Sequence, residues 1–181
     1  MAKNDHAHAV RLVESIQKNI GTDAATALEE RFPLSKSATL EKKYEWAKNS
    51  CTYLEEHYDT ETIIKLRKDC RCNDGNSIAA KLSKYLHKAE NIEAFVNAFN
   101  QQETFAAMEY ISDHQLLFCY PQCYCACIKR AADSVSKTWC YCTLGNAESI
   151  FRQVFPGENV KVTLIESIKT GGERCVIEVE W

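Results

Sequence analysis

Apart from a return to helical spacing over Leu144–Phe155, the spacing of apolar residues changes once along the chain, at about residue 115. Before this point it follows the helical period, most clearly in one stripe that steps alternately by four and three residues: Leu40, Tyr44, Ala47, Cys51, Leu54 and Tyr58. After it, apolar and polar residues alternate. A helix buries a stripe of period about 3.6 and a strand buries every second residue. The sequence therefore predicts an α+β fold, with N-terminal helices packed on one face of a C-terminal antiparallel sheet.

Residues that favour helix ends divide the first hundred positions into several helices. Gly21 is suited to follow the end of a first helix. Asp59 and Asn91 can each accept hydrogen bonds from the free N–H groups at a helix start, and Asn76 or Ser77 can begin a further helix.

The second part of the chain is predicted to hold strands and one helix. The expected elements are strands over Gln115–Tyr120, Gln122–Ile128 and Thr138–Cys142, a helix over Leu144–Phe155, and a terminal hairpin of Val160–Leu164 with Cys175–Trp181. Trp181 falls on the same face as Ile177 and Val179, so we expect it to be substantially buried. The length of 181 residues predicts a single domain, with residues 1–112 mainly helical and residues 113–181 forming a Cys-rich α+β part.

Composition excludes several classes of partner. The formal net charge is -3 and no run of five Lys or Arg residues occurs, so nucleic acid is not expected to bind. No apolar run approaches the roughly 18 residues that a membrane span needs, and the polar N-terminus lacks the layout of a secretory signal. These features predict a cytoplasmic protein of undetermined oligomeric state. Its 10 Cys residues would then remain thiols available for metal or redox chemistry.

Six of these cysteines lie between residues 119 and 142. Side chains two residues apart on a strand point to the same side, so Cys123, Cys125 and Cys127 would share one face, as would Cys140 and Cys142. A hairpin between the two strands would bring four thiols together. Four convergent thiols suit Zn²⁺, so we predict a zinc site of Cys123, Cys125, Cys140 and Cys142. Cys70, Cys72 and Cys127 are possible accessory ligands.

Other roles for the thiols stay open. Cys51 and Cys175 fit a core role as small hydrophobic residues, whereas Cys119 fits either the core or an accessory ligand. Cross-strand pairs such as Cys123 with Cys142 could form a redox-active dithiol.

A catalytic role is a further alternative. Cys127 or Cys72 would be the nucleophile, and His114, just before a predicted strand, could act as a base or ligand. His6 and His8 are expected in a frayed N-terminus.

The C-terminal residues resemble a known family. The run TWCYCTLG at 138–145, the helix ending in VFPG, and the final VKVTLIESIKTGGERCVIEVEW resemble bacterial L-2-amino-thiazoline-4-carboxylic acid hydrolase-like proteins. More distantly they are similar to 4-vinyl-reductase-type ligand-binding domains. The resemblance covers about residues 115–181. It implies a helix–sheet sandwich whose cavity holds a small molecule, with cysteines near the cavity as metal ligands.

These observations give three hypotheses of function. The first is a cytoplasmic bacterial-type domain that binds a metal, with zinc the expected ion, beside a small-molecule pocket in a sensing or binding role. The second is a hydrolase of a small cyclic amidine or amide that uses a pocket cysteine. The third is a dithiol redox protein.

Overall fold

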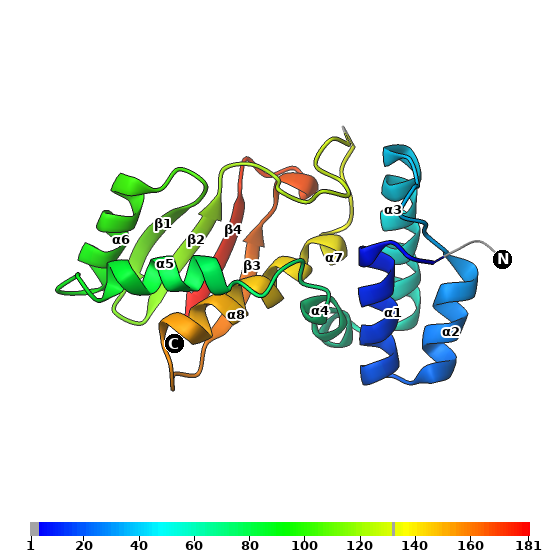
Figure 1. The fold of residues 1–181 in the computed structure, drawn as a ribbon, viewed down its shortest axis with the longest axis horizontal. Coiled ribbons are helices and arrows are strands. Elements are labelled where there is room, and N and C mark those ends of the chain that lie inside the picture. The colour runs from blue at the N-terminus through cyan, green and yellow to red at the C-terminus, as the bar shows by residue number, and fades with distance from the viewer. Residues whose placement is uncertain (1–3, 132) are drawn as a thin grey trace. The chain divides into compact units, whose positions relative to one another are not determined.

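The computed structural model describes residues 4–131 and 133–181, which form two compact units (Figure 1). The first unit combines the segment that ends at Cys72 with Tyr124–Cys142, and the second combines Asn73–Cys123 with Thr143–Trp181. That the chain is a single domain stays a prediction.

The first unit is helical. Its elements are α1 (Ala7–Asn19), α2 (Thr22–Arg31), α3 (Leu40–His57), α4 (Thr60–Asp69) and the short α7 (Lys137–Cys140). Helix α1 packs against α2 and α4, and α7 packs against α3 and α4. The Asp59 side chain accepts a hydrogen bond from Thr62 N at 2.7 Å, which confirms the predicted start of α4. Helix α2 has no counterpart among the predicted helices.

The second unit holds a four-stranded antiparallel sheet in the order β1-β2-β4-β3. Its elements are α5 (Asn76–Leu86), α6 (Ile92–Gln102), β1 (Ala107–Ser112), β2 (Gln115–Tyr120), α8 (Cys142–Val154), β3 (Lys161–Glu166), a 3-10 turn η1 (Ile168–Thr170) and β4 (Cys175–Glu180). The predicted terminal hairpin is confirmed, because Leu164 of β3 lies opposite Ile177 of β4. Strand β1, which pairs with β2, was not predicted.

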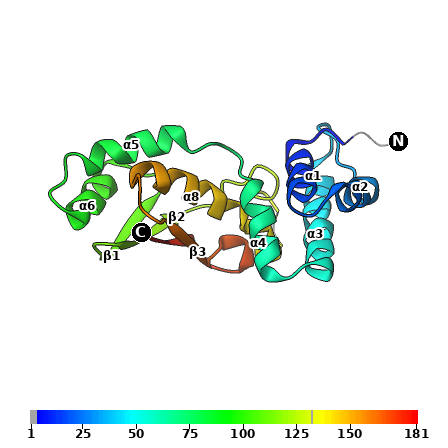
Figure 2. The ribbon, with the colours of Figure 1, turned by 90° about the horizontal axis from the view of Figure 1, so that it is seen from below.

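One face of the sheet is covered by helices (Figure 2). The Phe118 ring of β2 contacts Phe99 of α6, with ring centroids 6.3 Å apart, and Phe151 of α8, with centroids 5.4 Å apart. Both helices therefore pack on the face that carries Phe118. The predicted α+β class is confirmed, with helices against an antiparallel sheet.

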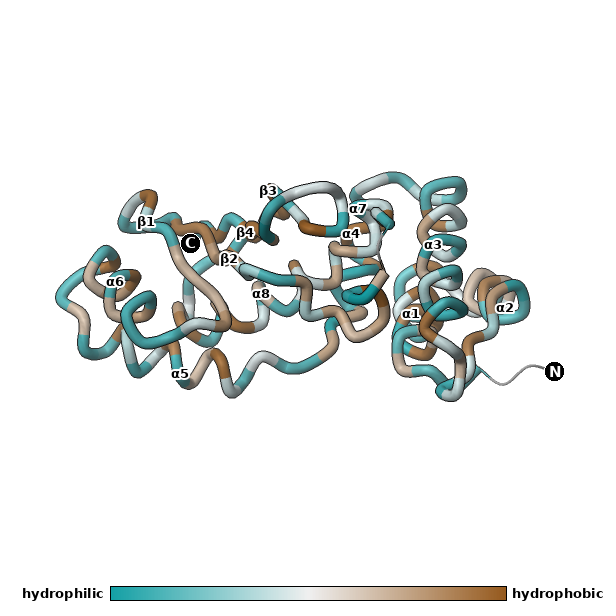
Figure 3. The backbone as a smooth tube through the Cα atoms, turned by 90° about the horizontal axis from the view of Figure 1, so that it is seen from above, coloured by the Kyte–Doolittle hydropathy of each residue, from teal (hydrophilic) through white to brown (hydrophobic). Residues whose placement is uncertain are grey.

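Hydrophobic and hydrophilic residues alternate along α3 and α6, as expected for amphipathic helices (Figure 3).

The prediction of two Cys-rich strands, over Gln122–Ile128 and Thr138–Cys142, is wrong. Pro121 follows β2, and the chain then forms turns in which Lys129 N donates to Cys125 O at 2.9 Å. Further on, Ser136 accepts a hydrogen bond from Thr138 N at 3.2 Å and starts α7, so Cys140 ends one helix and Cys142 begins the next. Strand β2 is already paired on both sides, and the Ser136 cap outweighs the strand preference of the following residues.

The end of the last strand is less buried than predicted. Trp181 is half-buried, and its ring stacks on that of Phe155 with centroids 4.0 Å apart. The backbone N–H of Trp181 donates to His114 O at 3.1 Å, and this hydrogen bond holds the last residue against the turn between β1 and β2. Among the helices of the described residues, none is long and apolar enough to cross a membrane.

Candidate functional site

Arg67 is a buried cation that no carboxylate of the described residues neutralises. It lies near the end of α4 and is only 1% exposed. Its Nη2 donates to Trp139 O at 2.8 Å and its Nε to Thr138 O at 3.3 Å. Within the described part of the chain, its ionisable neighbours that favour the charged state are thiols rather than carboxylates. Because burying an uncompensated charge is costly, the surroundings of Arg67 are the first candidate for a functional site.

Four cysteines favour the charged state of Arg67: Cys70, Cys142, Cys51 and Cys125. Cys72 also interacts with Cys125 and Cys142, and Cys140 interacts with Cys142. These six thiols come from α3, the end of α4, the turns after residue 124, and the junction of α7 and α8. We call Arg67 and these six thiols the Arg67 cluster.

Trp139 links Arg67 to the thiols. The guanidinium carbon of Arg67 lies 4.6 Å from the centroid of the Trp139 ring. The indole Nε1 donates to Cys125 Sγ at 3.4 Å. On its other sides the ring contacts Trp46, edge to face at 5.8 Å, and His8 at 5.5 Å. Trp139 therefore fixes the position of the guanidinium and of one thiol together.

Arg11 brings a second cation to the cluster. Its Nη2 lies 3.8 Å from Cys72 Sγ and 3.5 Å from His8 Nδ1. Its Nε is buried and has no hydrogen-bond partner among the described residues. His8 is 6% exposed, so it is not in a frayed terminus as predicted. Burial, with Arg11 and Arg67 nearby, lowers the pKa of His8 to about 3, which keeps its imidazole neutral near pH 7.

Burial raises the pKa of the cluster thiols, whereas the arginines lower it. Burial raises the pKa of Cys51 to about 12 and also raises the pKa of Cys70 and Cys142, although Arg67 acts to lower all three. For Arg67, burial acts to lower its pKa, but the four neighbouring cysteines raise it overall. The cluster is thus arranged so that thiolates, once formed, are stabilised by Arg67.

The cluster contains three of the four predicted zinc ligands. Cys125, Cys140 and Cys142 belong to it, together with the predicted accessory residues Cys70 and Cys72. Cys123 belongs to the second unit. Among residues 4–131 and 133–181, no three His, Cys, Asp or Glu side chains are positioned to hold a metal ion. The thiols are therefore gathered but not assembled into a coordination shell.

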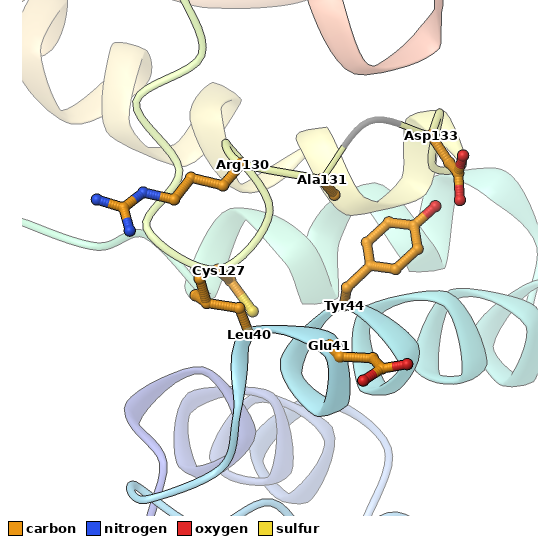
Figure 4. A pocket seen from close by; sticks show the side chains of 7 residues that line it. All are labelled: Leu40, Glu41, Tyr44, Cys127, Arg130, Ala131 and Asp133. Atoms are coloured by element: carbon orange, nitrogen blue, oxygen red, sulfur yellow. The ribbon is translucent and has the colours of Figure 1, made fainter.

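Cys127 lies at a pocket beside the cluster. A cavity of about 220 Å³ is lined by Leu40, Glu41, Tyr44, Cys127, Arg130, Ala131 and Asp133 (Figure 4). In Figure 4 the Tyr44 hydroxyl points toward Asp133, while Arg130 points away from both. The Cys127 thiol donates to Lys43 O at 3.5 Å, and burial raises its pKa to about 12. A small molecule in this pocket would therefore meet a neutral thiol.

The remaining predicted residues lie in the second unit. Cys119 is buried in β2, which favours its core role, whereas Cys175 in β4 is only half-buried. His114 is exposed at the turn between β1 and β2, where its ring contacts Trp181. Its predicted role as a base or ligand stays a prediction.

Four residues of the site were not predicted: Arg67, Arg11, His8 and Trp139. The sequence carries a signal for one of them. Ile63, Leu66, Arg67 and Cys70 are spaced by three, one and three residues, which places Arg67 on the buried stripe of α4. A charged residue on a buried stripe is rarely found without a specific role.

The structure of this chain has a low similarity to solved structures of H-NOX proteins. The Fe(II)NO form from S. oneidensis is 12% identical, with a TM-score of 0.44, over 96% of this chain and 97% of that chain. The Fe(II)CO domain from Shewanella oneidensis is 12% identical, with a TM-score of 0.45, over 99% of this chain and 98% of that one. An unliganded Fe(II) mutant from K. algicida is 8% identical, with a TM-score of 0.46, over 96% and 94%. Similarity at this level assigns no function.

Sequence comparison is more decisive about the family. No curated protein matches the chain. The resemblance of residues 115–181 to the hydrolase-like proteins stays a prediction. One family model matches residues 1–180, which is nearly the whole sequence. The chain therefore belongs to the family of unknown function DUF6144.

Proposed function

We propose that the chain is a metal-binding module in which Cys70, Cys72, Cys125 and Cys142 hold Zn²⁺ as thiolates. The proposed role is binding or sensing, in the cytoplasm, where thiols stay reduced. Cys125 and Cys142 belong to the zinc set expected from the sequence. Cys70 and Cys72 replace Cys123 and Cys140, because both interact with Arg67 and with each other.

The observation that carries this proposal is the burial of Arg67 among thiols, with no neutralising carboxylate in the part of the chain that the structure describes. A buried guanidinium needs a compensating negative charge. Thiols supply that charge only as thiolates, and a bound metal ion deprotonates its thiol ligands. A zinc ion with four thiolates has a formal charge of about -2.

Zinc binding would have to draw the thiols closer together, because the described residues include no preformed metal shell. The free energy of zinc binding to a structural site, about 10–16 kcal/mol in small zinc domains, is ample for such a rearrangement. The ligands lie at the end of α4, in the turns after residue 124 and at the start of α8. Binding would therefore change the geometry of three elements, as a sensor requires.

The alternatives receive less support. A disulfide is neutral, so oxidation of two cluster thiols would leave Arg67 without a counter-charge. A hydrolytic nucleophile needs a thiol with a lowered pKa, whereas burial raises the pKa of Cys127. The pocket at Cys127 remains the candidate site for a small-molecule ligand.

Titration of the reduced protein with Co²⁺ tests the proposal. Cobalt bound by thiolates shows a charge-transfer absorption that grows with the number of sulfur ligands, and Zn²⁺ should displace it. We expect one site per chain, with a weaker band in Cys125→Ser and Cys142→Ser. Cys175→Ser, which alters a half-buried cysteine of the second unit, is the control. Absence of the band in the unaltered protein would refute zinc binding.

A further inference from the structure

We propose that the pocket at Cys127 binds a small organic cation, an amine whose apolar part enters the pocket. This binding rests on the small-molecule part of the proposed function, and it requires no metal ion. Three features of the pocket support it: its fixed walls, its apolar lining and the direction of its charged groups (Figure 4).

Hydrogen bonds hold the walls of the pocket together. The Cys127 side chain is only 4% exposed, and its thiol donates to Lys43 O of α3 at 3.5 Å. The Tyr44 hydroxyl donates to Ser134 O at 3.0 Å. Both contacts join α3 to the turns that follow residue 124. The cavity of about 220 Å³ is therefore formed before any ligand enters.

The size and lining of the pocket point to an organic ligand. Leu40, Ala131 and the buried Cys127 side chain line it, together with the ring of Tyr44. Its volume of about 220 Å³ equals that of roughly seven water molecules at about 30 Å³ each, which is far more than a single ion fills. Within the described chain, no three His, Cys, Asp or Glu side chains are positioned to hold a metal ion.

The charges at the pocket favour a cation. Two carboxylates line it, Glu41 in the first turn of α3 and Asp133 in the turns opposite. Arg130 also lines the pocket, but its guanidinium points away from Tyr44 and Asp133 (Figure 4). Two carboxylates and one guanidinium leave a single negative charge, which one ammonium group matches.

The Tyr44 ring adds a second attraction for an ammonium group. The face of an aromatic ring is negative and attracts cations within about 6 Å of its centroid. The Lys48 ammonium already lies 5.6 Å from the centroid of this ring. Because the Tyr44 hydroxyl points toward Asp133, an ammonium group held here would gain from the ring and from the carboxylate (Figure 4).

The experiment titrates the reduced protein, freed of metal by a chelator, with n-butylammonium and follows the backbone amide signals by NMR. The neutral n-butanol and the anionic butanoate are probes of similar size. Glu41→Gln and Asp133→Asn each remove one carboxylate, and Ala131→Leu fills the pocket without changing its charge. Glu45→Gln, at an exposed position of α3, is the matched control.

We expect n-butylammonium to bind with a dissociation constant on the order of 1 mM, because Glu41 and Asp133 are both exposed. It should bind about tenfold more tightly than n-butanol, and butanoate should bind more weakly still. Glu41→Gln and Asp133→Asn should each weaken the binding about threefold, the effect of one exposed ion pair. Ala131→Leu should weaken it as well, and Glu45→Gln should not.

Three results would overturn the proposal. They are no response to n-butylammonium far above the expected dissociation constant, equal affinity for the three probes, and an equal loss in Glu45→Gln and in the two pocket carboxylate variants. The amide spectrum shows whether each variant is folded, and the carboxylate variants decide if Ala131→Leu is not. Because no metal is present, failure here would not contradict the zinc site, and a protein that binds no Zn²⁺ would still bind the amine.

Discussion

The guanidinium of Arg67 stacks 4.6 Å above the ring of Trp139 and donates a hydrogen bond to the carbonyl oxygen of the same residue at 2.8 Å. This double contact joins α4 to α7. Because the Trp139 indole also donates to Cys125, one buried pair connects three of the segments that carry thiols. Stability and the arrangement of the cluster should therefore change together.

Replacing Trp139 tests that connection. Trp139→Ala should lower the free energy of unfolding by about 3–5 kcal/mol, the usual cost of removing a large buried aromatic side chain. Trp139→Phe should cost less, because it keeps a ring under Arg67 and loses the hydrogen bond to Cys125. Urea unfolding measures both, and a loss below about 1 kcal/mol for the Ala variant would show that the ring is not part of the core.

The pH dependence of stability should report on His8. Its pKa is about 3 in the folded protein, below the usual 6.5, so protons bind preferentially to the unfolded chain. The contribution of His8 to the free energy of unfolding is therefore complete above pH 6.5. It is lost as the pH falls toward 3, by up to about 1.4 kcal/mol per pH unit. His8→Gln should flatten this slope, and His87→Gln, at an exposed position, should not. Equal slopes in both variants would contradict burial of His8.

Gly75 should tolerate no side chain. It precedes α5 with φ +76°, and a Cβ atom there would lie 2.6 Å from Ile150 Cγ1 of α8. Gly75→Ala should therefore cost about 1–3 kcal/mol through backbone strain and overpacking. Gly171→Ala is the control, since φ is +97° but no atom lies within 4 Å of the added Cβ. Thermal unfolding should show the greater loss for Gly75→Ala.

The stacked pair of Phe155 and Trp181 should stabilise the second unit. Their rings are 4.0 Å apart and nearly parallel, at 10°. Trp181→Ala should cost about 1–3 kcal/mol, since the side chain is only half-buried. A double-mutant cycle with Phe155→Ala should give a coupling of about 0.5–1.5 kcal/mol. Additive losses would mean that the rings do not interact in solution.

Thiol labelling distinguishes the binding role from the hydrolase alternative. Burial raises the pKa of both candidate nucleophiles, that of Cys127 to about 12, so the binding role predicts slow reaction of Cys72 and Cys127 with iodoacetamide at neutral pH. Peptide mass spectrometry over time gives the rates. Rapid labelling of Cys127 at neutral pH would instead support a nucleophile at the pocket.

Local signals in the sequence predicted much of the fold. Asp59 and Asn91 cap helices in the structure as their side chains suggest, and the alternation over Cys175–Trp181 predicts the last strand. These features depend on contacts between residues close in sequence, so they can be inferred from spacing alone.

The site could be predicted only in part, because long-range pairing determined its geometry. The alternating cysteines of residues 122–128 have a strand-like period, but β2 already has two neighbours and offers this segment no partner. The contact of Arg67 with Trp139 joins residues 72 positions apart, and no local pattern reveals it. Arg67 could have been noticed from its place on the apolar stripe of α4, but its proximity to the predicted thiols could not.

Elemental analysis of the protein purified without a His tag tests the central claim most directly. The Arg67 cluster should hold about one zinc ion per chain, and Cys125→Ser and Cys142→Ser should reduce this content sharply while Cys175→Ser leaves it unchanged. A protein without bound zinc, in which all 10 cysteines titrate freely as thiols and added Zn²⁺ leaves the melting temperature unchanged, would contradict the account.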